Sequence, residues 1–206
     1  MLKGYYINLD HRIDRMNHFK ELKTKYPFFK NTERISAIKN KNGAIGCGMS
    51  HIKVLKQLLE MDDDMFIICE DDLTILNNTN YEKFVNDFDN IKTNNDWDII
   101  VLTPRGDRYE STLGNNFHRI ICNQTTTGYI IKKTFIPTLI NNLKDAIIGL
   151  MKNLDPNTYA IDQYWKRLQI EHNFYYYDKI FAGQLVGFSD IENRPVNYND
   201  RYIQQK

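Results

Sequence analysis

The chain has 206 residues, of which 42% are hydrophobic and 26% charged, and its formal net charge is +1. This is the composition of an ordinary globular protein, and the length suits one α/β domain over residues 1–206. The near-neutral charge provides no strong electrostatic field for nucleic acid or an anionic membrane, so we expect neither as a partner.

Apolar segments and cysteines indicate the cellular compartment in which we expect the protein. No apolar segment approaches the length of a membrane span, and the N-terminus leads into a strand pattern without a signal-peptide segment. The three cysteines, Cys47, Cys69 and Cys122, are scattered and odd in number. This favours reduced thiols over a disulfide framework or a zinc site, so we expect a cytoplasmic protein.

The first half of the chain alternates apolar strand patterns with amphipathic helix patterns. Asp10 is the expected N-cap of the first helix, which should end before Pro27. This alternation predicts a mostly parallel sheet with helices on both faces. In chain order we expect a strand at 4–9, a helix at 12–25, a strand at 32–38, a helix at 46–60, a strand at 65–72, a helix at 81–92 and a strand at 97–102.

The second half is more mixed. Residues 117–122 and 127–131 are expected to form a pair of neighbouring strands. We expect helices at 135–152 and 160–169, a last aromatic strand at 174–181, and an irregular tail from 183.

The most informative feature is the run of acids that ends the strand at 65–72, namely Glu70, Asp71 and Asp72. Ligands of open α/β sheets bind beyond the carboxyl ends of such strands. Because strand side chains alternate, Glu70 and Asp72 should point to one side and Asp71 to the other. A divalent cation, Mg²⁺ or Mn²⁺, would relieve their repulsion and leave positions for the phosphate oxygens of a nucleotide.

The alternative for these acids is that they are solvated turn residues. The chain contains another acidic run, Asp62 to Asp64, which we interpret as a surface loop. Position separates the two runs, because the loop acids precede the apolar strand and the other three follow it.

Two other segments could contact a nucleotide. Arg12 and Arg15 lie three apart on one helical face beyond the first strand, where they could meet a phosphate; surface ion pairs are the alternative. Gly43, Gly46 and Gly48 precede Ser50 and His51 and could expose backbone N–H groups to phosphate or sugar oxygens. This segment is neither a Walker A loop nor a Rossmann fingerprint, and a tight loop with local hydrogen bonds is the alternative.

A fourth segment combines Asp162 with Tyr164 and Trp165. Aromatic rings stack on the apolar faces of sugars while carboxylates accept their hydroxyl groups, which suggests an acceptor site. The alternative is a helix N-terminus with aromatic core residues. The segment 184–191 would, on its own, be a plain loop.

Taken together, these segments resemble glycosyltransferase family 25, which includes lipooligosaccharide and collagen galactosyltransferases. The ordered motifs cover almost the whole chain. They are Ile7 to Arg15, Gly43 to His51, Glu70 to Asp72, Trp97-Asp98, Thr127 to Tyr129, Asp162, and Gln184 to Ile191.

The resemblance implies a GT-A fold with a Rossmann-like sheet, a UDP-sugar donor, a glycan or hydroxylated acceptor, a Mn²⁺ or Mg²⁺ ion, and inversion at the anomeric carbon. On this basis we expect Asp72, with Glu70, to hold the metal. Asp162 is the expected catalytic base and Asp190 its competitor, while Tyr164 and Trp165 are expected to bind the acceptor. The expected donor residues are Asn8, Leu9, Arg12, Arg15, Gly46, Ser50, His51, Glu70 and Asp71.

Two alternatives come from other functional classes. The segment from Glu70 to Thr74 superficially resembles the motif of haloacid-dehalogenase-type phosphatases, but Glu70 stands where their nucleophile belongs, and that motif belongs on the first strand. A catalytically silent carbohydrate-binding module would need neither nucleotide nor metal, and the intact acid motif argues mildly against it.

Overall fold

The computed structural model describes residues 2–114 and 116–198, without the side chains of residues 106–112. Its centre is an eight-stranded sheet with the order β2-β1-β3-β8-β5-β9-β7-β6. The strands of this sheet are β1 (Lys3–Asn8), β2 (Thr32–Ser36), β3 (Met65–Glu70), β5 (Ile99–Val101), β6 (Arg105–Gly114), β7 (Phe117–Gln124), β8 (Gly128–Lys132) and β9 (Phe174–Tyr177).

Most of these strands run in one direction. β1 is parallel to β2 and β3, and β5 is parallel to β9, whereas β7 and β8 run against their neighbours. The prediction of an α/β protein with a mostly parallel Rossmann-like sheet is confirmed. Because β1 and β3 are adjacent and parallel, the residues that follow them meet at one edge of the sheet.

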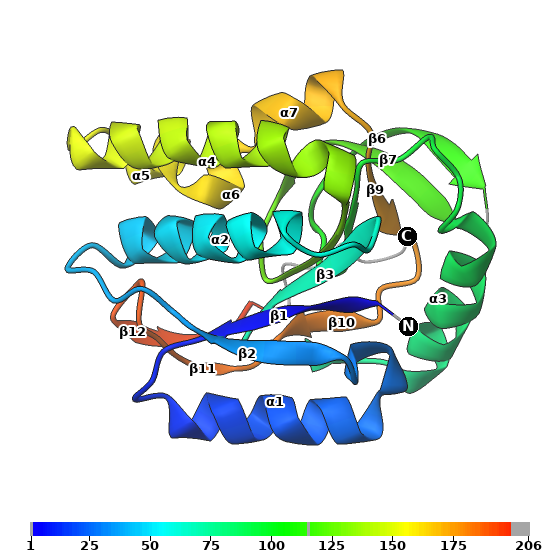
Figure 1. Ribbon diagram of the computed structural model, residues 1–206, viewed down its shortest axis with the longest axis horizontal. Helices are drawn as coiled ribbons and strands as arrows, with labels where there is room; N and C mark the ends of the chain where they lie inside the picture. The colour runs from blue at the N-terminus through cyan, green and yellow to red at the C-terminus, as the bar shows by residue number, and fades with distance from the viewer. Residues whose placement is uncertain (1, 115, 199–206) are drawn as a thin grey trace.

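Helices cover both faces of the sheet, as Figure 1 shows: α2 and α4 lie on one side and α1 on the other. The longer helices are α1 (Ile13–Lys25), α2 (Gly43–Leu59), α3 (Asn78–Ile91) and α4 (Ile136–Met151), and the short ones are α5 (Pro156–Tyr159), α6 (Ile161–Tyr164) and α7 (Lys166–Glu171). Among the described residues, no helix combines the length and the apolar character needed to cross a membrane.

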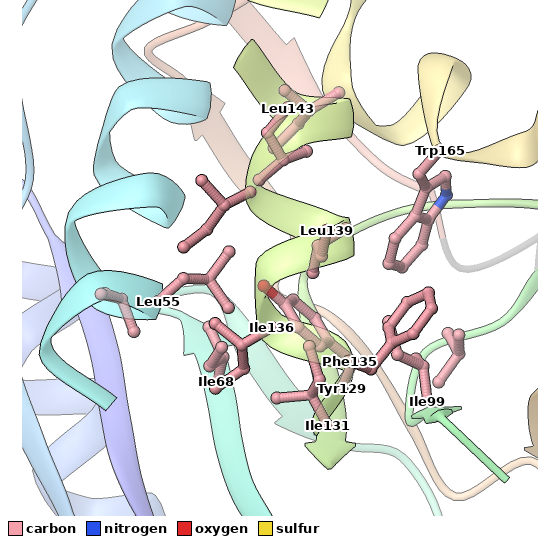
Figure 2. Close-up of a cluster of buried hydrophobic side chains, with 14 of the residues drawn as sticks. Leu55, Ile68, Ile99, Tyr129, Ile131, Phe135, Ile136, Leu139, Leu143 and Trp165 are labelled. Atoms are coloured by element: carbon pink, nitrogen blue, oxygen red, sulfur yellow. The ribbon is translucent and has the colours of Figure 1, made fainter. Parts of the chain in front are cut away.

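Alternate side chains of the central strands supply two cores. Ile68 packs with residues of α2 and α4, such as Leu55 and Leu139, whereas its neighbour Ile67 packs with Phe19 of α1 and residues of α3. Figure 2 shows the first of these clusters, in which Trp165 lies near Phe135 and Tyr129. Burial on both faces explains why β3 has a continuous apolar sequence.

Several predicted boundaries need correction. Asp10 is not the N-cap of α1, because the helix begins at Ile13 and its N-cap residue is Arg12. No side chain in the described part of the chain caps this helix. The Asp10 carboxylate instead accepts hydrogen bonds from Arg34 and Ser36. Helix α2 begins earlier than predicted, at Gly43, because the Asn42 side chain accepts hydrogen bonds from the first N–H groups of the helix.

The second half departs further from prediction. The segments 117–122 and 127–131 do form strands, but they are not partners: β8 lies between β3 and β5, and β7 lies between β9 and β6. The helix predicted at 160–169 is interrupted at Trp165. The tail is not wholly irregular, since it contains short strands that pair with β4 (Leu73–Ile75) or with each other: β10 (Ala182–Gln184), β11 (Gly187–Ser189) and β12 (Arg194–Val196).

Candidate active site

A cavity of about 510 Å³ lies at the edge of the sheet where β1 and β3 end. Most of the predicted site residues line it, although they come from segments far apart in the sequence. Asn8, Arg12, Tyr164 and Trp165 are not among its lining residues. The predicted residues in its wall are Leu9, Arg15, Gly46, Ser50, His51, Glu70, Asp71, Asp72, Asp162 and Asp190.

Glu70 is the last residue of β3 and faces the helix α2 side of the cavity. Its Oε1 atom accepts a hydrogen bond from Thr126 Oγ1 at 2.8 Å and lies 3.3 Å from His51 Nε2. Burial alone would raise the pKa of Glu70, but the hydrogen bonds from His51 and Thr126 lower it below the usual value. Glu70 is therefore held as a carboxylate at the cavity wall.

Asp71 is held by Asn8, the last residue of β1, and by Arg15 in α1. Its Oδ2 atom accepts a hydrogen bond from Asn8 Nδ2 at 2.7 Å, and its Oδ1 atom accepts one from Arg15 Nη1 at 3.0 Å. Asn8 is only 1% exposed, and its own side-chain oxygen accepts a hydrogen bond from Arg34 at 2.8 Å. Asn8 thus positions Asp71 and does not itself face the cavity.

Asp72 is the acid with spare binding capacity. One oxygen, Oδ2, lies 3.3 Å from Arg15 and 3.4 Å from Gln184 Nε2. The other, Oδ1, is buried and has no hydrogen-bond partner among the described residues. Burial and the nearby charge of Glu70 raise the pKa of Asp72 to about 7. A buried carboxylate oxygen without a partner is costly unless something positive binds it, so this donor set fits a divalent cation.

Arg15 and Arg12 connect this edge of the sheet to the β11–β12 hairpin. Both guanidinium groups donate to the carbonyl oxygen of Phe188, from Arg15 at 2.8 Å and from Arg12 at 3.2 Å. Arg12 also pairs with Asp14 and Asp190. Arg15 is only 9% exposed and lines the cavity, whereas Arg12 is fully engaged by acids beside it.

The glycine-rich segment forms the first turns of α2 and not a loop. A Cβ atom on Gly46 would lie 2.6 Å from the carbonyl oxygen of Ile38, so this glycine permits close packing of the helix against residues 38–40. Ser50 Oγ donates to the Gly46 carbonyl at 2.7 Å and accepts from Ile38 N–H at 2.8 Å. Ser50 therefore fixes the cavity wall through two backbone contacts.

The two base candidates have different surroundings. Burial and the nearby Glu70 raise the pKa of Asp162, although Arg105 and Lys166 oppose the shift. Burial would also raise the pKa of Asp190, but hydrogen bonds from Arg12 and His11 lower it. A raised pKa suits proton abstraction better than a lowered one, because a more basic carboxylate removes a proton more readily.

Trp165 requires a correction. Its ring is 0% exposed, its N–H donates to the Asn123 carbonyl at 3.2 Å, and it packs edge-on against Phe174. It presents no free face to a sugar, so the expected acceptor contact is wrong for this residue. The ring of neighbouring Tyr164 is covered by the Arg167 guanidinium at 3.5 Å and stacks on Tyr159. Both residues anchor the short helices that hold Asp162.

Sequence reasoning missed Thr126, Gln184 and Arg105, which all line the cavity. Thr126 directly precedes a family motif and Gln184 begins another, so their place in those motifs was the available signal. Arg105 follows β5 after a Thr-Pro pair, and its position in the sequence carries no such signal.

Comparison with known proteins decides the family. The family model described as glycosyltransferase family 25 (LPS biosynthesis protein) matches residues 36–165, more than half of the chain. The chain belongs to glycosyltransferase family 25. A search of curated protein sequences found no significant match.

Solved structures resemble this family 25 chain in fold. One is a glycosyltransferase involved in the glycosylation of the major capsid of PBCV-1, at 12% identity and a TM-score of 0.57, covering 93% of this chain and 96% of that one. The apo form of a UDP-glucose pyrophosphorylase matches at 12% identity and a TM-score of 0.46, covering 84% of this chain and 67% of that one. The first of these supports the predicted GT-A-like arrangement.

Proposed function

We propose that this family 25 glycosyltransferase transfers a hexose, galactose or glucose, from a UDP-sugar to a glycan or hydroxylated acceptor, with inversion at the anomeric carbon and a requirement for Mn²⁺ or Mg²⁺. We also propose that residues 1–206 act as one GT-A domain. The observation that carries this proposal is the buried Oδ1 atom of Asp72, which has no partner among the residues that the structure describes and lies beside Glu70 in the cavity at the end of β3.

Asp72 and Glu70 would hold the cation. When bound, the ion neutralises negative charge on the departing UDP, which is where charge accumulates in the transition state. Asp71 has a different role, because its two oxygens are engaged by Asn8 and Arg15 and it thereby orients the turn that carries Asp72.

Asp162 is the proposed base. Its carboxylate removes the proton from the acceptor hydroxyl, the acceptor oxygen attacks the anomeric carbon, and the bond from that carbon to the UDP oxygen breaks with its electron pair leaving on UDP. Arg105 and Lys166 lie close enough to Asp162 to influence its ionisation, so they stabilise its charged, proton-accepting form. Asp190 is held by Arg12 and His11, which favours a role in positioning the hairpin.

The remaining expectations are compatible with this proposal. A reducing, cytoplasmic compartment also belongs to the proposal, because the three cysteines Cys47, Cys69 and Cys122 are scattered and odd in number. The phosphatase alternative is not favoured, because the acid motif follows β3 in a chain of family 25.

A panel of UDP-sugars tests the proposal. Hydrolysis and thermal shift should be measured for UDP-galactose, UDP-glucose and their N-acetylated analogues, with and without Mn²⁺. We expect a shift with one hexose donor that requires the metal, together with slow metal-dependent hydrolysis. A stabilising glycan without any response to UDP-sugar or metal would instead support the silent carbohydrate-binding module.

A further inference from the structure

Cys47 lies in the same wall of the cavity as the acid motif, although the cysteine spacing in the sequence predicts no zinc site. It stands four residues before His51 on α2, so the two side chains share one face of the helix. The sulfur of Cys47, a ring nitrogen of His51 and a carboxylate oxygen of Glu70 all lie within 4.8 Å of one another. A thiolate, an imidazole and a carboxylate are the three ligand types that Zn²⁺ accepts from proteins.

The Tyr129 side chain on β8 contacts the other ring nitrogen of His51. Its hydroxyl oxygen lies 3.0 Å from His51 Nδ1, while Nε2 of the same ring faces Glu70 at 3.3 Å. Without a metal, Nε2–H donates to Glu70; when a cation replaces that proton, Nδ1–H can donate to the Tyr129 hydroxyl oxygen and Nε2 directs its lone pair to the ion. Metal-binding histidines are usually oriented in this way by a second hydrogen bond.

The three residues also belong to the wall of the cavity, with the His51 side chain buried behind its surface. Cys47, His51 and Glu70 all line it, and Cys47 is half-buried. Three protein ligands with an open side would leave a fourth position for water or another ligand, as in zinc sites that are not closed structural sites.

We propose that Cys47, His51 and Glu70 form a second cation site that selects a soft divalent metal, Zn²⁺, over Mn²⁺ or Mg²⁺. Selectivity follows from the thiolate and imidazole, because hard cations favour an all-oxygen ligand set. The Cys47 thiol loses its proton to solvent as the metal binds. Since Glu70 belongs to both ligand sets, zinc at this site competes with the donor-site cation and inhibits transfer; this second statement rests on the proposed function.

Cobalt(II) is a suitable probe, because its bond to a thiolate produces a charge-transfer absorption that an all-oxygen site cannot produce. The wild-type protein should show this band with one equivalent of Co²⁺ and lose it on addition of Zn²⁺, but keep it in excess Mg²⁺. The band should be absent from Cys47→Ser and retained in Cys122→Ser, a matched change at another half-buried thiol. Tyr129→Phe should weaken Zn²⁺ binding by about 10–100-fold.

A second measurement on the wild-type protein does not depend on any variant folding. Alkylation of Cys47, followed by mass spectrometry, should be slowed by Zn²⁺ and unaffected by Mg²⁺, while alkylation of Cys122 should be unaffected by either ion. Absence of the Co²⁺ band in wild-type protein, its persistence in a folded Cys47→Ser variant, or no protection of Cys47 by zinc would overturn the site.

The proposed function can fail independently of this site. Asp72→Asn should keep the Co²⁺–thiolate band, because Asp72 is not one of the three ligands, and should still lose metal-dependent UDP binding. Loss of the band in a folded Asp72→Asn variant would contradict the assigned zinc ligands. Zinc bound at Cys47 with no effect on Mn²⁺-dependent UDP binding would overturn the competition through Glu70.

Discussion

Arg15 donates a 3.0 Å hydrogen bond from Nη1 to Asp71 Oδ1, and the two side chains are only 10% and 9% exposed. The same guanidinium group donates to the Phe188 carbonyl in the C-terminal hairpin. One arginine thus joins α1, the acid motif and β11. It is not the exposed arginine that its sequence position suggests, so its removal should affect more than nucleotide binding.

We therefore expect Arg15→Ala to destabilise the protein by about 3–5 kcal/mol, because it leaves Asp71 and Asp72 as buried acids without their cation. UDP affinity should fall as well, since both acids lose their fixed positions. Chemical denaturation and calorimetry on the same sample would measure the two effects. Lys20→Ala on the exposed face of α1 is a matched control and should change stability by less than about 0.5 kcal/mol. Weak UDP binding with unchanged stability would show that Arg15 contacts the nucleotide alone.

Gly46→Ala should also be destabilising, although alanine favours a helix over glycine. The added Cβ atom would lie 2.6 Å from the Ile38 carbonyl, and such overpacking typically costs about 1–3 kcal/mol. We expect a lower midpoint of denaturation and weaker donor binding, because residues 38–40 form part of the cavity wall.

The matched control for Gly46→Ala is Gly187→Ala, because an added Cβ at Gly187 meets no atom of the described residues within 4 Å. That variant should retain the stability and donor affinity of the wild type. Equal behaviour of the two variants would show that the close approach of α2 to Ile38 does not shape the site.

The strand that ends in the acid motif could be predicted because a strand buried on both faces has an uninterrupted run of apolar residues. Ile67 and Ile68, which point to opposite faces, are both 0% exposed. Sequence reasoning could not place β8 between β3 and β5, because antiparallel pairing over such a distance in sequence leaves no local pattern. The role expected for Trp165 was wrong as well, because aromatic residues near a carboxylate form the same sequence pattern whether they bind sugars or fill a core. Only the three-dimensional contacts of Trp165 with Asn123 and Phe174 separate the two.

Asp162→Asn should reduce transfer by about 10²–10⁴-fold while donor binding persists, as expected for a general base. The stability of this variant should not fall. The raised pKa of Asp162 means that folding opposes its ionisation, so at neutral pH its charge destabilises the native state and the amide removes that penalty. Initial rates, UDP titration and thermal denaturation would test the three parts together.

Asp190→Asn is the comparison for that prediction. It should loosen the hairpin by removing the carboxylate that pairs with Arg12 and His11, and it should leave most of the transfer rate. Retained transfer in Asp162→Asn together with lost transfer in Asp190→Asn would move the base to Asp190.

The pH dependence of transfer provides a further check on Asp162. Its raised pKa predicts that the carboxylate is protonated, and therefore inactive as a base, at pH values where an ordinary aspartate is still charged. At saturating Mn²⁺ and donor, which keep Asp72 charged, the rate should fall as the pH is lowered, with a midpoint above the usual aspartate range. This acid limb should vanish in the residual activity of Asp162→Asn. An acid limb at the ordinary value, unchanged in that variant, would assign the titration to another group.

The metal assignment at Asp72 is tested most directly by calorimetric titration of UDP in the presence and absence of Mn²⁺, with Asp72→Asn compared to the wild type. Asp62→Asn, an exposed acid before β3, is the matched control for loss of one charge. We predict that the wild type and Asp62→Asn bind UDP only with the metal, and that folded Asp72→Asn loses this metal-dependent binding. Unchanged UDP affinity and metal response in Asp72→Asn would contradict the assignment of the acid motif.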